Sequence, residues 1–141
     1  MQQEIQSAGV RANAICGATA ETHEEHIQRL KDTASLRMCQ AHAILTKAYE
    51  PAYVTTVDAI TGGGVEYLCE AGIRDCNELI GLGYIDVELA KQFLVSAVGL
   101  LRLCCSDDEF SADQAFGIAV LIHKAYEESL RFSERRSKVL Q

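Results

Sequence analysis

The chain has 141 residues, of which 48% are hydrophobic and 23% are charged, and its formal net charge is −7. This length is typical of one domain, and the apolar content is enough to build a buried core. The net negative charge argues against binding nucleic acid, because contacts to phosphates need a cationic surface. The chain has a single proline, Pro51, and no tryptophan, a composition that favours helices over a turn-rich β fold.

The cysteine pattern points to a reducing compartment. Six cysteines are present, but the chain begins with "MQQEIQSAGVRANAICGATA", which lacks the basic and apolar regions of a secretory signal. No C-x-x-C pair occurs, which removes the commonest zinc and redox signatures. Most cysteines fall on apolar faces of predicted helices, where a free thiol packs as a small hydrophobe. We therefore expect a cytoplasmic protein.

Two helices are predicted in the first third of the chain, a weak one over residues 2–16 and a long one over residues 22–49. Thr22 is the expected N-cap of the long helix, with Glu25 three residues later in a capping box. Pro51 ends this helix. The apolar stripe of the long helix recurs at spacings of three and four and consists of Ile27, Leu30, Ala34, Met38, Ala41, Leu45 and Ala48.

Residues 53–69 leave two alternatives open. The β-branched run "YVTTV" fits a strand, which could form a hairpin with "VEYLCE" beyond the glycines. The same segment fits a helix, a break near residues 61–64 and a second helix, and this is the alternative we expect. The Thr-Gly-Gly-Gly run does not read as a phosphate-binding loop, because no lysine or arginine lies between Tyr49 and Ile73 and Glu66 follows the glycines.

The second half of the chain is predicted to be helical. The pattern from Val65 continues to Ile80 and is stopped by Gly81 and Gly83. Asp86 is the expected cap of a helix over 87–105. This helix is apolar nearly all round from residue 93, yet too short to span a bilayer, so we expect it to be the most buried helix.

The last helix is predicted from 112 to about 136. Ser111 and Gln114 have the spacing of a capping box. Its core face is expected to hold Ala115, Ile118, Ala119, Ile122, Tyr126 and Leu130. Val120 and Leu121 fall outside this stripe, and with Phe116 they are the candidate residues for a partner or dimer interface.

Together these elements predict an all-α single domain over residues 1–141, an antiparallel bundle of four to six helices with weakly ordered ends at 1–4 and 134–141. No internal repeat is evident in the sequence.

His23 and His26 form the best candidate for a metal site. They share one helix face, but zinc or iron would need further ligands from elsewhere, such as Glu25, His42 or His123. A metal- or cofactor-binding bundle is therefore the alternative hypothesis, and our main expectation includes no metal and no cofactor.

The sequence contains no recognisable nucleophile or acid–base motif. We expect a non-catalytic protein-binding module: a regulator, an inhibitor, an immunity-type protein or an adaptor. It is expected to be homodimeric, with no role for nucleic acid or a membrane.

Overall fold

The computed structural model describes residues 20–140, with side chains up to residue 131. The predicted helix over 2–16 and the weakly ordered end at 1–4 lie outside the described residues. The elements in chain order are α2 (His23–Tyr49), β1 (Thr56–Asp58), α3 (Ala59–Gly81), a short 3-10 helix η1 (Ile85–Val87), α4 (Glu88–Cys104), β2 (Glu109–Ser111) and α5 (Ala112–Leu140).

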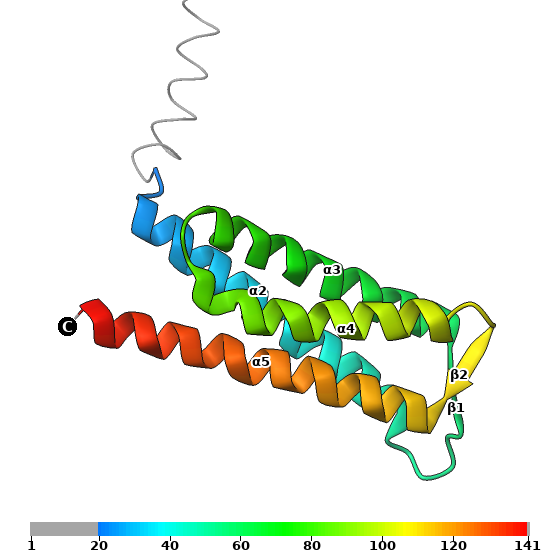
Figure 1. Cartoon of the computed structure of the whole chain (residues 1–141). Coiled ribbons are helices and arrows are strands. Elements are labelled where there is room, and N and C mark those ends of the chain that lie inside the picture. Colours follow the sequence, from blue (N-terminus) through cyan, green and yellow to red (C-terminus); the bar gives the residue numbers. More distant parts are fainter. Residues whose placement is uncertain (1–19, 141) are drawn as a thin grey trace, which may run out of the picture.

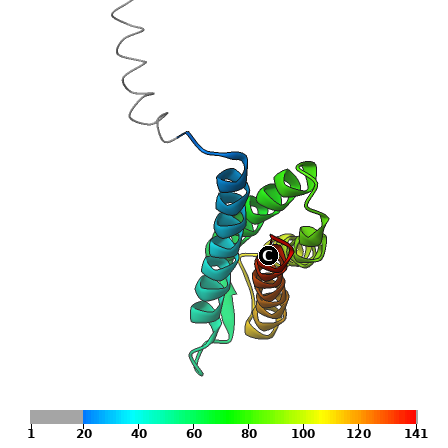
Figure 2. The same cartoon turned by 90° about the vertical axis from the view of Figure 1, so that its left-hand side faces the viewer.

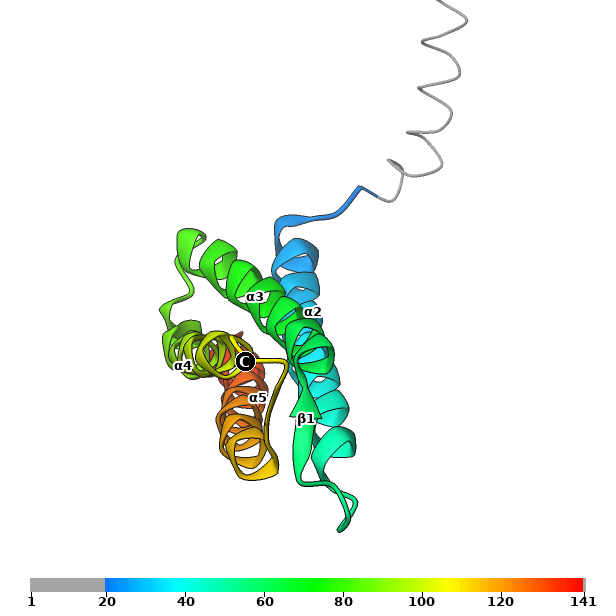
Figure 3. The ribbon, with the colours of Figure 1, turned by 90° about the vertical axis from the view of Figure 1, so that its right-hand side faces the viewer.

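The α-helices of the described part form an antiparallel bundle (Figure 1). Each helix packs against two neighbours, since α2 and α4 both lie against α3 and α5. Viewed from the side that carries the strands, α3 is inclined across α2, and β1 runs beside the end of α2 (Figure 3). The predicted all-α class is confirmed. Among residues 20–140, no helix has the length and apolar character needed to cross a membrane.

The core lies between the helices and draws on all of them. The stripe predicted on the long helix is confirmed, because Ile27, Ala34, Met38 and Leu45 are all fully buried on α2. Small residues alternate with large ones along this stripe, which lets side chains from facing helices interdigitate. The view in Figure 2 shows the long α2 beside α5, with α3 behind them.

Local capping explains where two helices begin. Thr22 Oγ1 accepts the backbone N–H of Glu25 at 3.1 Å. At α5 the capping box is complete, since Ser111 Oγ accepts the N–H of Gln114 at 3.0 Å and Gln114 Oε1 accepts the N–H of Ser111 at 3.0 Å. The expected cap at Asp86 is wrong: that residue lies inside η1, and the N-cap of α4 is Val87, which makes no side-chain capping bond.

Neither alternative for residues 53–69 is correct. The β-branched run does give a strand, but β1 pairs antiparallel with the distant β2, with Val57 opposite Phe110. The break expected near residues 61–64 is wrong as well, because α3 runs through all three glycines. Asp58 Oδ1 accepts the N–H of Thr61 at 2.7 Å and so starts α3 ahead of the glycines.

Helix α4 is not the most buried helix, contrary to the expectation. It packs on α3 and α5, and its remaining side lies in solvent and carries Leu89, Leu100 and Leu103. Helix α4 is therefore apolar nearly all round because one of its sides packs in the core and another apolar side is exposed to solvent. Helix α5 also extends beyond its expected end, to Leu140.

Candidate protein-binding surface

The solvent side of α4 and α5 carries the apolar surface that we call the α4–α5 face, defined by Leu89, Phe93, Leu100, Leu103, Val120 and Leu121. Leu103 is 74% exposed and Leu89 is 45% exposed. Leu89, Phe93 and Leu100 recur at helical spacing and so share one side of α4. Large apolar side chains left in water on one side of a domain are typical of interaction surfaces.

Two shallow cavities follow the seam between α4 and α5. One of about 250 Å³ is lined by Leu100, Cys104, Gln114, Gly117 and Ile118. Gly117 has open space at its Cβ position, so a partner's side chain can approach the α5 backbone there. The other cavity, of about 280 Å³, lies between Leu89 and Phe93 on one side and Lys124 on the other. The seam is therefore concave and apolar near Gly117, and it becomes charged toward Lys124.

The three residues predicted for the interface lie on different parts of α5. Val120 is exposed, and Leu121 is half-buried against the core. Phe116 is 56% exposed and sits toward α2, where its ring stands edge-on to Tyr49 with 6.1 Å between centroids. Val120 and Leu121 belong to the α4–α5 face, whereas Phe116 marks its border.

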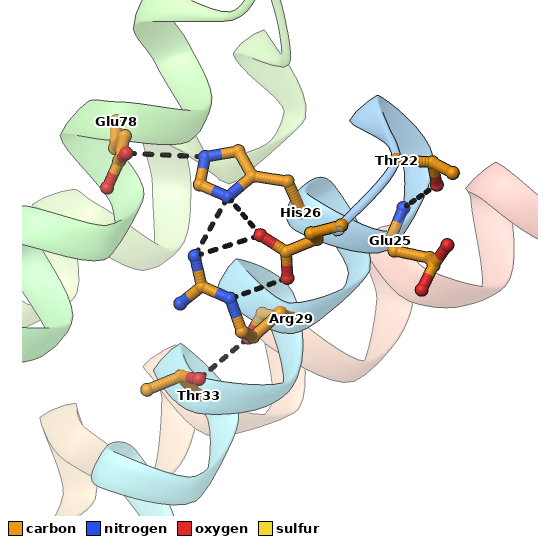
Figure 4. Close-up of polar contacts among 7 residues, drawn as sticks. Thr22, Glu25, His26, Arg29, Thr33 and Glu78 are labelled. Carbon is orange, nitrogen blue, oxygen red and sulfur yellow. Dashed lines mark hydrogen bonds and ion pairs between the residues drawn. The ribbon is translucent and has the colours of Figure 1, made fainter. Parts of the chain in front are cut away.

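The seam between α2 and α3 has the opposite character and is closed by ion pairs (Figure 4). His26 Nε2 lies 3.4 Å from Glu78 Oε1 across the seam. Beside it, at the start of α2, Arg29 Nε donates to Glu21 Oε2 at 2.7 Å, and the guanidinium holds the pKa of the Glu21 carboxyl below its ordinary value. Deeper in the seam, Arg37 Nη1 donates to the Ala71 carbonyl at 3.1 Å.

Asp75 is a buried carboxylate in the same seam. Burial raises its pKa above the ordinary value, and the nearby guanidinium of Arg37 partly offsets that effect. Arg37 Nη1 lies 3.2 Å from Asp75 Oδ2, although this oxygen accepts no well-aligned hydrogen bond from the described residues. Arg37 is thus needed mainly as a counter-charge.

The two histidines of the metal hypothesis, His23 and His26, have different surroundings in the structure. His26 is engaged on both ring nitrogens, with Nδ1 2.9 Å from Glu21 Oε1 and Nε2 3.4 Å from Glu78 Oε1 (Figure 4). His23 is exposed. Within residues 20–131 no three histidine, cysteine or acidic side chains are grouped closely enough to hold a metal ion. The described geometry therefore gives His23 and His26 no third ligand.

A different pair of histidines meets across α2 and α5. The rings of His42 and His123 lie 5.1 Å apart between centroids, in a tilted arrangement. Burial lowers the pKa of His42 below 6.5, and the charge of a protonated His123 lowers it further. His123 Nε2 also lies 3.6 Å from Glu127 Oε1, on its own helix. Protonation of His42 is therefore disfavoured in the folded protein, chiefly by burial.

The cysteines that the structure describes are all free thiols. Burial raises the pKa of both Cys69 and Cys76 to about 12, so neither ionises near neutral pH. Cys39 is exposed rather than packed on an apolar face. Cys16 lies outside the described residues.

Sequence reasoning missed the contribution of α4 to the candidate surface. The helix was expected to be the most buried one because it is apolar nearly all round from residue 93, so the exposed Leu100 and Leu103 were not singled out. Arg102 was the available signal, since it lies on the side of α4 toward α3 and pairs there with Glu66 and Glu70. An ion pair on that side leaves the leucines at the opposite edge of α4 as additional surface.

No family model, no curated protein and no solved structure matches this chain.

Proposed function

We propose that this chain is a non-catalytic protein-binding module of the cytoplasm, acting as a regulator, inhibitor, immunity-type protein or adaptor, and that it forms a homodimer through the α4–α5 face. Free thiols suit a reducing compartment. The net charge of −7 suits a protein partner with a basic surface rather than a nucleic acid.

The observation that carries the proposal is the exposure of Leu89, Leu100 and Leu103 along one side of α4, together with the exposure of Val120 on α5. Each apolar side chain held in water costs free energy that burial in an interface would recover, at about 25 cal/mol per Å². The α2–α3 seam shows that this bundle also closes a seam with polar contacts, the His26–Glu78 and Arg37–Asp75 pairs. The fold therefore does not itself require apolar side chains on the α4–α5 face.

Size-exclusion chromatography with light scattering on the full chain tests the dimer. The wild type is expected to have twice the mass of one chain. Leu103→Lys places a charge within the apolar face and is expected to weaken the dimer by about tenfold or more, the effect of losing a central contact.

Leu36→Lys is the matched control, because Leu36 is a 55% exposed leucine on α2, away from the α4–α5 face. It receives the same new charge and is expected to keep the wild-type mass. A wild type that remains a monomer at high concentration contradicts the dimer. Equal effects of the two substitutions would place the interface elsewhere.

A further inference from the structure

The two strands are related to each other by a local two-fold axis. Val57 pairs with Phe110 at the centre of the ladder, and both are buried. The hydrogen bonds that flank the ladder also match: Ala59 N–H donates to the Asp108 carbonyl at 2.8 Å, and Ala112 N–H donates to the Thr55 carbonyl at 2.8 Å. Exchanging β1 with β2 leaves this pattern unchanged.

The helices that follow the strands begin in the same way. Asp58, directly after Val57, caps α3 by accepting the N–H of Thr61. Ser111, directly after Phe110, caps α5 by accepting the N–H of Gln114. Beyond the caps most buried positions coincide at the same distances along the chain, although buried Ala71 corresponds to exposed Lys124 and buried Ala119 to half-buried Glu66. The corresponding buried pairs are Gly62 and Ala115, Val65 and Ile118, Cys69 and Ile122, Gly72 and Ala125, Asp75 and Glu128, and Cys76 and Ser129.

The helices that precede the strands correspond as well. In both α2 and α4 an Ala-x-x-x-Met/Leu-x-x-Ala-x-x-x-Leu pattern supplies the core face. All of its members are buried, and so are the residues three positions before the first alanine, Lys31 and Val87. The corresponding pairs are Ala34 and Ala90, Met38 and Leu94, Ala41 and Ala97, and Leu45 and Leu101.

The same relation holds for the packing between the two halves. Helix α2 lies on α5 as α4 lies on α3. The two grooves at these contacts have similar volumes, about 440 Å³ and about 460 Å³. Cys39 and Tyr126 line the first groove, and the residues at the corresponding places, Val95 and Ile73, line the second.

We infer that the bundle consists of two copies of one helix–strand–helix unit, α2–β1–α3 and α4–β2–α5, and that each unit's buried face is a docking surface for the matching unit. The partner this surface fits is the other unit, either of the same chain or of a second copy. Within the chain the units are joined only through residues 82–87, where Gly83 has a φ of 97°. If two chains exchange units, every contact between the units forms again between the chains. Such an exchange therefore gives a dimer at a low cost in free energy.

Complementation between two damaged full-length chains tests this inference. One chain carries Met38→Asp and Leu45→Asp, and the other carries Leu94→Asp and Leu101→Asp, so each has one unit destroyed at matching buried positions. Each variant alone is expected to lose its helical circular dichroism, because unpaired carboxylates in the core are not tolerated. An equimolar mixture is expected to recover about half of the wild-type signal, since two chains then supply one complete bundle.

The control is a mixture of two chains that are both damaged in the first unit, Met38→Asp with Leu45→Asp and Ile27→Asp with Ala41→Asp. It supplies only second units and is expected to recover less than the complementary mixture. No recovery in the complementary mixture, or equal recovery in both, overturns the inference. The docking surface tested is buried and separate from the α4–α5 face. A dimer formed by exchange of units would also have twice the mass of one chain, so the response to Leu103→Lys, and not the mass alone, tests the α4–α5 face.

Discussion

Gly62 and Gly63 are neighbours in α3, but a methyl group added at each would meet opposite surroundings. At Gly62 a Cβ would meet Cys105 Sγ and lie 2.9 Å from Phe110 Cε1, whereas at Gly63 nothing lies within 4 Å. Gly62→Ala is therefore expected to destabilise the protein by about 1–3 kcal/mol through overpacking. Gly63→Ala is expected to stabilise it by about 0.5–1 kcal/mol, because alanine is the better helix former.

Urea unfolding followed by circular dichroism measures both changes. Gly64→Ala serves as a second exposed control and is expected to behave like Gly63→Ala, since its Cβ position is also open. If Gly62→Ala proved as stable as Gly63→Ala, the close packing of α3 against Phe110 would be refuted. The pair thus separates a glycine required for packing from one that is merely tolerated.

At the scale of elements, features that depend on residues close together in the sequence are predicted correctly. Features that depend on contacts between distant segments are not. The core stripe of α2 and the Ser111–Gln114 capping box are confirmed, because each depends on residues a few positions apart. The β1–β2 ladder is not visible from local patterns, since Val57 finds its partner at Phe110. The glycine run looked like a break for the same reason: the tertiary contact that fills the space beside Gly62 comes from β2 and the end of α4.

The candidate surface shows the same limit. Val120 and Leu121 were identified because they fall outside a clear core stripe on their own helix. The leucines of α4 were not identified, because apolar residues on all sides of a helix give no indication of which side meets a neighbour. Only the packing of α4 on α3 and α5 assigns Leu100 and Leu103 to the solvent side.

The histidine contact between α2 and α5 predicts a dependence of stability on pH. The pKa of His42 in the folded state lies below the 6.5 of an unfolded histidine, chiefly because the ring is partly buried. As the pH falls, the unfolded chain therefore takes up this proton first. The contribution of His42 is complete above about pH 6.5 and is lost as the pH falls from there toward its folded-state pKa.

Chemical unfolding from about pH 8 to about pH 5, in wild type and His42→Gln, measures this effect. The variant is expected to lose less stability over the interval, because its side chain binds no proton. His23→Gln is the control at an exposed histidine of the same helix and is expected to follow the wild type. Parallel curves for wild type and His42→Gln would refute the assignment.

At the scale of the whole molecule, the two units offer a comparison within one chain. Position for position, Leu103 of α4 corresponds to Lys47 of α2, Phe93 to Arg37, and Leu89 to Thr33. The α2–α3 seam is polar at these places and is closed by the Arg37–Asp75 ion pair. At these positions the first unit thus carries polar residues and the second carries apolar ones, which is consistent with the proposed binding role of the second unit.

This difference leads to a prediction about thermal stability. If folding and dimerisation through the α4–α5 face are coupled, the midpoint of thermal unfolding rises with protein concentration, by mass action. The wild type is expected to show this rise over a roughly hundredfold range of concentration. The variant Leu103→Lys gives the second unit the residue type found at Lys47 in the first. Its midpoint is expected to be lower than that of the wild type at high protein concentration and nearly independent of protein concentration.

A midpoint that rises equally in both proteins would show that Leu103 lies outside the interface. A midpoint independent of concentration in the wild type would contradict dimerisation coupled to folding.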